Sequence, residues 1–83
     1  MEKVKLMEIL AKAKVSAERA TLYADAFLEY TAAQKNIDDN GAIVADPRTG
    51  SPIPNPYLQV RDKAFARLET LHKAGVRAPG LWL

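Results

Sequence analysis

The sequence of 83 residues contains no cysteine and a single histidine, His72. Disulfide bonds and cysteine-based zinc sites are therefore excluded, and one histidine cannot build a zinc site with aspartates alone at any recognised spacing. A chain of this length forms one domain at most, and so small a domain buries too little surface for a secure core of its own. Because neither a disulfide nor a metal can add stability, we expect self-association into a homo-oligomer.

Long apolar runs are missing as well. No stretch of about 18 apolar residues could cross a membrane. Charged residues interrupt the N-terminal MEKVKLMEILAKAKV, where a signal peptide would need an apolar centre. The sequence therefore predicts a cytoplasmic protein without a membrane partner.

The usual catalytic and nucleotide-binding motifs are also absent. There is no Walker-type phosphate loop, no GxGxxG, no HExxH and no nucleophile elbow. The stretch NIDDNG, residues 36–41, matches the first half of a calcium loop, but Pro47 stands where the bidentate glutamate belongs. We therefore expect no enzymatic activity, no catalytic residue, no metal, no cofactor and no small-molecule substrate.

The charge of the chain is modest, with a formal net value of +2. Residues 1–40 hold six Lys or Arg and seven Asp or Glu, a balance of −1, and residues 41–83 hold six and three, a balance of +3. A dedicated nucleic-acid reader is more basic, so we expect weak, non-specific and salt-dependent contact with double-stranded DNA. The candidate contacts are Lys3, Lys5, Lys12, Lys14 and Arg19. A solvated helix face is the alternative interpretation of these cations.

Apolar residues recur at helical spacing in two N-terminal segments. Residues 2–13 fit a short amphipathic helix, and Ser16 stands at an N-cap position before a longer helix over roughly residues 17–38. An aromatic and aliphatic stripe runs along this helix and onto a later one. Its members are Tyr23, Phe27, Tyr30, Leu68 and Leu71. We expect this stripe to be shared between the core of a helical hairpin and the contacts between subunits.

The chain changes character between the helices. Gly41 ends the longer helix, AIVAD and SPIPNP are typical of short extended segments, and Gly50 is placed for a positive φ. Residues 41–54 therefore predict a β-hairpin or an ordered crossover. Pro52 and Pro54 alternate, which places both missing donors on the same side of an edge strand. A loop this long and rigid is expected to be ordered and to project from the helical pair.

Asn55 and Pro56 then open a further helix, as a cap followed by a proline at the first helical position, and this helix is expected to end near Gly75. The sequence thus predicts a mainly α-helical fold. An antiparallel helical hairpin follows a short helix and carries the small β-hairpin between its two long helices. The expected organisation is a short helix over residues 1–15, an oligomerisation domain over 16–75 and a C-terminal tail over 76–83.

The order of these elements from Leu22 to Val76 is specific. It consists of a glycine, a short apolar strand, a TG turn, a run of prolines, and an Asn-Pro-Tyr that opens a long helix ending at a glycine. The positions are Gly41, Ile43, Val44, Thr49, Gly50, Pro52, Asn55, Pro56, Tyr57 and Gly75. This arrangement resembles the small terminase subunits of tailed bacteriophages and prophage-like elements.

The resemblance implies a non-enzymatic adaptor in the cytoplasm of a bacterial host. Such subunits form homo-oligomeric rings through a central helical hairpin and engage the viral genome when packaging begins. They also recruit and regulate the large terminase subunit, which holds the ATPase and the nuclease. The apolar residues Leu81, Trp82 and Leu83 would then dock the large subunit, and folding back onto the protein is the alternative for this tail.

The N-terminus departs from the family pattern. Small terminase subunits commonly carry an N-terminal helix-turn-helix, which needs at least two helices, whereas the residues before Ser16 leave room for one. The chain is therefore expected either to be a fragment or to have lost sequence-specific DNA reading, and Met1 favours the second. An adaptor of that kind would suit a gene transfer agent.

A second interpretation stays open from the sequence. It is a small helical protein-interaction or regulatory module of phage origin without a packaging role. The mass in solution would separate the two, because a monomer or a simple dimer favours the module.

Overall fold

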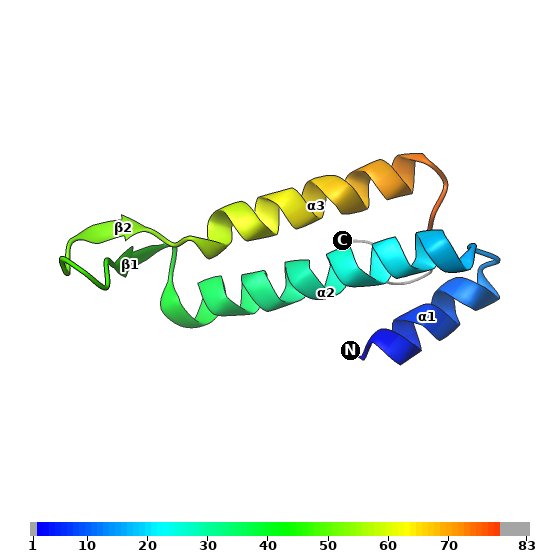
Figure 1. Cartoon of the computed structure of the whole chain (residues 1–83), viewed down its shortest axis with the longest axis horizontal. Coiled ribbons are helices and arrows are strands. Elements are labelled where there is room, and N and C mark those ends of the chain that lie inside the picture. Colours follow the sequence, from blue (N-terminus) through cyan, green and yellow to red (C-terminus); the bar gives the residue numbers. More distant parts are fainter. Residues whose placement is uncertain (1, 79–83) are drawn as a thin grey trace.

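The fold is an antiparallel pair of long helices with a short helix at one end and a β-hairpin at the other (Figure 1). A computed structural model describes residues 2–78. Along the chain the elements are α1 (Lys3–Lys12), α2 (Ala17–Asn40), β1 (Ile43–Ala45), β2 (Pro52–Pro54) and α3 (Tyr57–Lys73). The molecule measures 49 × 22 × 19 Å, because the β-hairpin extends the long axis of the helical pair. The predicted mainly helical fold is confirmed.

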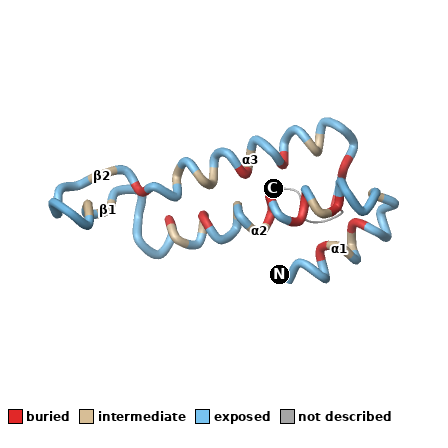
Figure 2. Tube along the Cα trace, in the orientation of Figure 1, coloured by how far each residue is buried: buried red, intermediate tan, exposed pale blue. Residues whose placement is uncertain are grey.

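The core lies where α1 folds back along α2, at the end of the molecule away from the β-hairpin (Figure 2). Its largest fully buried side chains are Tyr23, Leu6, Leu10, Leu68 and Val76. Each large apolar side chain contributes about 1.5–3 kcal/mol when it leaves water. Because these residues come from all three helices and from the segment after α3, one cluster holds the whole helical part together.

The segments predicted to flank the oligomerisation domain contribute to this core. Leu6 and Leu10 of α1 have none of their surface exposed, and Val76 and Ala78 are each 2% exposed. Small residues help the helices approach, since Ala24 of α2 and Ala64 of α3 are fully buried. The short helix and the first residues after α3 are therefore parts of the same folding unit as the helical pair.

Both ends of α2 follow from local chemistry. The Ser16 hydroxyl accepts a hydrogen bond from the Arg19 N–H (3.4 Å), which satisfies one donor that a helix N-terminus leaves unpaired. At the other end the Gly41 N–H bonds to the Ile37 carbonyl (2.7 Å), and Gly41 has φ = 89°, which glycine adopts without a side-chain clash. The predicted cap and terminating glycine are confirmed, and α2 extends to Asn40 rather than residue 38.

The helices α1 and α3 end in one and the same motif. After α1, the Val15 N–H bonds to the Leu10 carbonyl and the Lys14 N–H to the Ala11 carbonyl, both at 3.0 Å. This Schellman pattern needs a left-handed residue. Lys14 holds that position with φ = 62°, and Gly75 holds it after α3 with φ = 90°. In a sequence, a glycine predicts a helix end of this kind because it adopts the left-handed conformation readily, whereas a lysine does not.

The strands β1 and β2 confirm the predicted hairpin. They pair antiparallel, with Ile43 opposite Pro54, Val44 opposite Ile53 and Ala45 opposite Pro52. Just beyond one end of the ladder the Asp46 N–H bonds to the Ser51 carbonyl (2.8 Å). Just beyond the other, the Asn55 N–H bonds to the Ala42 carbonyl (2.8 Å). Bonded and non-bonded pairs alternate in an antiparallel ladder, so both prolines lie at non-bonded positions. Their backbone nitrogens, which lack a hydrogen, point away from β1 on the outer edge of β2, as predicted.

Asn55 joins the β-hairpin to both long helices. Its side chain is buried, at 2% exposure for the residue. The amide nitrogen donates to the Asn36 side-chain oxygen and to the Gly41 carbonyl, each at 3.0 Å, and the amide oxygen accepts from the Tyr57 N–H at 2.9 Å. The predicted role of Asn55 as the cap of α3 is confirmed. The same side chain also ties the end of α2 to the start of the hairpin.

Candidate functional surfaces

An apolar groove of about 430 Å³ runs along the surface between α2 and α3. It is lined by Leu22, Asp25, Ala66, Arg67, Thr70 and Leu71. Leu22 is 60% exposed. Ion pairs lie at the rim, between Arg67 and Glu29 and between Asp25 and Lys3. The groove is thus an apolar strip with charged edges, the composition of a protein-contact surface.

The predicted stripe lies mostly inside the protein. Tyr23 and Leu68 have no exposed surface and Phe27 is 8% exposed, and the Tyr23 and Phe27 rings stack with their centroids 6.3 Å apart. Tyr30 and Leu71 are partly buried and pack against the edge of the core. The stripe therefore builds the core of the chain itself and reaches the surface through Tyr30 and Leu71.

Sequence reasoning did not select Leu22, which lies on the groove rather than on the stripe. The signal was present, because Leu22 is an apolar residue next to Tyr23 and points to another side of α2. Val4 is one of the apolar residues at helical spacing in residues 2–13, yet it is 65% exposed. Val4 lines a second apolar hollow, of about 580 Å³, between α1 and the start of α2.

The candidate DNA contacts are all exposed and are spread along α1, the turn that follows it and the first turn of α2. The structure brings Lys14 and Arg19 together on a hollow of about 460 Å³ that Ser16 and Gly75 also line. Lys3 instead forms an ion pair with Asp25 at 2.9 Å. Two of the five candidate cations therefore share one hollow, and the set does not form a compact patch.

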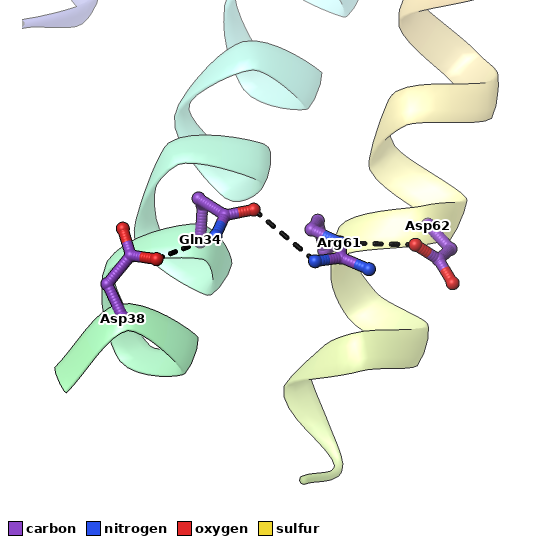
Figure 3. A network of polar contacts seen from close by, with 4 residues as sticks. All are labelled: Gln34, Asp38, Arg61 and Asp62. Atoms are coloured by element: carbon purple, nitrogen blue, oxygen red, sulfur yellow. Dashed lines mark hydrogen bonds and ion pairs between the residues drawn. The ribbon is translucent and has the colours of Figure 1, made fainter. Parts of the chain in front are cut away.

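Polar contacts join α2 and α3 on the side toward the β-hairpin (Figure 3). The Gln34 amide donates to the Asp38 carboxylate (2.9 Å), and the Arg61 guanidinium donates to the Gln34 amide oxygen (3.4 Å). Arg61 also pairs with Asp62 (3.2 Å). Because the chain of contacts crosses from one helix to the other, it helps to set how the two helices align along their lengths.

The described residues hold no group of three or more His, Cys, Asp or Glu positioned for a metal ion. In the same part of the chain, no helix is both long and apolar enough to cross a membrane. The predicted docking residues Leu81, Trp82 and Leu83 lie outside the described residues.

The family model of the phage terminase small subunit matches residues 3–74, from the start of α1 to the end of α3. The chain belongs to this family. Comparisons with curated proteins and with solved structures find no match.

Membership of the terminase small subunit family indicates a role in phage DNA packaging. Terminase small subunits are in general non-catalytic adaptors, and they work in a complex with a large subunit and DNA. The match also covers α1 and its lysines, which the resemblance noted in the sequence, from Leu22 to Val76, did not reach. The family thus extends over all three helices and the β-hairpin.

Proposed function

We propose that this terminase small subunit acts as a ring-shaped homo-oligomer that contacts DNA weakly and without sequence preference and recruits the large terminase subunit. Residues 16–75 are the oligomerisation unit in this proposal. The observation that carries it is the apolar groove between α2 and α3, with Leu22 60% exposed beside it. A second copy that covers this groove would bury its apolar surface. That burial would stabilise a domain that is too small to bury much surface by itself.

The subunit contact is proposed to centre on the groove and to include the surface-reaching members of the stripe, Tyr30 and Leu71. Tyr23, Phe27 and Leu68 act behind them by holding α2 and α3 in place. The charges of the two helices favour a contact between α2 of one copy and α3 of the next. From the sequence, α2 carries two cations and five acidic groups, and α3 carries four cations and two acidic groups, so the two helices have opposite net charge.

DNA contact is proposed for Lys3, Lys5, Lys12, Lys14 and Arg19, with Lys14 and Arg19 as the pair that can reach one phosphate together. The large subunit is proposed to dock on Leu81, Trp82 and Leu83. A ring would present several copies of this apolar segment at once, so individually weak contacts would add up to useful avidity.

The test of assembly is Leu22→Asp, measured by light scattering. Leu22 lies outside the core, so the substitution leaves the helical pair folded, and a carboxylate in a covered groove costs several kcal/mol. We expect the assembly to dissociate while the helical content is unchanged. Ala32→Asp is the matched control, because Ala32 is an exposed residue of α2 that does not line the groove.

An unchanged mass for Leu22→Asp would remove the groove from the subunit contact. A wild-type mass equal to a monomer or a simple dimer would instead favour the helical interaction module without a packaging role.

A further inference from the structure

The two edges of the β-hairpin are chemically different. Edge strands normally present a row of unpaired N–H and C=O groups that can pair with another chain, and proteins often block them with proline. Here β2 carries prolines at both outward-facing positions, Pro52 and Pro54. The β1 edge has no such block, although its residues Ile43 and Val44 are β-branched and favour strands.

The register shows which main-chain groups of β1 are available. The neighbouring residues Ala42 and Asp46 bond inward across the hairpin. Because bonded and non-bonded positions alternate, the N–H and C=O of Ile43 and Ala45 point away from β2. Both residues are exposed, Ile43 to 61%, and the hairpin projects beyond the ends of α2 and α3 (Figure 1). Within residues 2–78 the outer edge of β1 is therefore open.

The exposed face of the hairpin is also apolar. Side chains alternate between the two faces of a strand, so Ile43, Ala45, Pro52 and Pro54 lie on one face, and all four are exposed. A two-stranded hairpin is marginal in water, and three or more strands with an apolar face are usually needed for stability. The hairpin thus gains from the addition of a strand, and that strand can enter along β1 alone.

We infer that the open edge of β1 pairs with the same edge of a second copy, as antiparallel strands related by a two-fold axis. Ile43 lies opposite Ala45 of the second copy, and each such pair exchanges its two main-chain hydrogen bonds. The product is a continuous sheet of the order β2, β1, β1, β2. Prolines lie on both outer edges of that sheet, so no further strand can be added.

Three features identify a second copy as the partner. The edge is short, and a copy of it supplies donors and acceptors at the matching spacing by symmetry. Residues 42–45 carry no charge, so two identical edges meet without like-charge repulsion. Pairing of β1 with β2 of another copy is excluded, because a proline ring stands where each donor would be. The contact is a pairing of two molecules and is independent of the groove between α2 and α3.

The test uses Ala45→Pro in the full chain. The Ala45 N–H is not used within the hairpin, so the substitution removes an edge donor and places a ring in the path of the second strand, while the fold remains. We expect the mass of the assembly at high protein concentration to halve relative to the wild type. Ala45→Ser keeps the N–H and is expected to keep the wild-type mass. Thermal melts monitored by circular dichroism verify that both variants fold equally well.

Hydrogen exchange on the unmodified protein gives an independent measurement. The Ile43 and Ala45 amides are expected to exchange several-fold more slowly at high than at low protein concentration, in contrast to those of the turn residues 48–50. Exchange rates that do not depend on concentration, together with an unchanged mass for Ala45→Pro, would overturn the pairing. Protection of these amides that arises only on addition of another protein would also overturn it. Groove variants such as Leu22→Asp change the mass by another route, so the failure of ring assembly is distinguishable from the failure of this pairing.

Discussion

At the scale of single residues, Tyr23 combines full burial with an unpaired polar group. The residue has none of its surface exposed, and its hydroxyl has no hydrogen-bond partner among the residues that the structure describes. Burial removes the hydroxyl from water and raises the pKa of Tyr23 above its ordinary value of 10.0, because the charged form loses its solvation. The ring stabilises the core, whereas the hydroxyl works against it.

We therefore predict that Tyr23→Phe raises the free energy of unfolding at neutral pH by about 1 kcal/mol, the typical cost of a buried polar group left unpaired. Chemical denaturation followed by circular dichroism measures the change. Tyr57→Phe is the control, because Tyr57 is 44% exposed and its hydroxyl is not in the core. A loss of stability in Tyr23→Phe would show that the hydroxyl has a partner after all.

The raised pKa also predicts a pH dependence. Below pH 10 the Tyr23 hydroxyl is protonated in both the folded and the unfolded chain and contributes no slope. Above that pH the unfolded chain releases the proton more readily than the folded one, so stability is lost as pH rises through the folded-state pKa. Melts at increasing alkaline pH should show a smaller loss in Tyr23→Phe than in the wild type.

At the scale of elements, the junction around Asn55 decides whether the β-hairpin holds its position. Its side chain satisfies Tyr57, Gly41 and Asn36 at once. Asn55→Ala removes a helix cap and three part-buried hydrogen bonds of a buried side chain, so we predict a loss of about 2–3 kcal/mol in the free energy of unfolding. Asn40→Ala is the matched control, since the Asn40 side chain is exposed and bonds within its own helix. Equal effects of the two substitutions would contradict the role given to the junction.

The elements show clearly where sequence reasoning succeeds. Four residues have a conformational or hydrogen-bonding preference that predicts a helix end or a turn, and each lies at such a place in the structure. They are Ser16, Gly41, Gly50 and Asn55. The end of α1 lacked such a mark, because Lys14 adopts a left-handed conformation that lysine rarely takes. The structure there follows from packing of α1 on α2, which local preference does not encode.

At the scale of the whole molecule, periodicity indicated which residues are apolar but not which of them the chain buries by itself. It predicted the stripe, and the structure places Tyr23 and Leu68 in the core. It did not predict that Leu22 and Val4 stay exposed, because that depends on where α1 crosses and how α2 and α3 rotate about their axes. These candidate contact surfaces are therefore properties of the assembled helices.

The scattered cations lead to a prediction about DNA. Binding should be weak and should fall steeply with salt, and the double substitution Lys14→Gln with Arg19→Gln should lower the log–log salt slope by about two. Fluorescence anisotropy with two unrelated DNA duplexes over a salt series measures both slope and preference. Lys63→Gln on α3 is the control, with no expected change in slope. Tight discrimination between the duplexes at physiological salt would contradict the prediction.

The Asn55 junction has a mechanical consequence for the molecule. The hairpin joins the helices at two chain connections, from α2 and into α3, and Asn55 bridges both of them. A swing of the hairpin about either connection would break hydrogen bonds to the other, so the junction has no free hinge. A force applied near Arg48 at the tip would therefore act on α2 and α3 together. The hairpin and the two helices would move as one rigid body and transmit the force along the long axis.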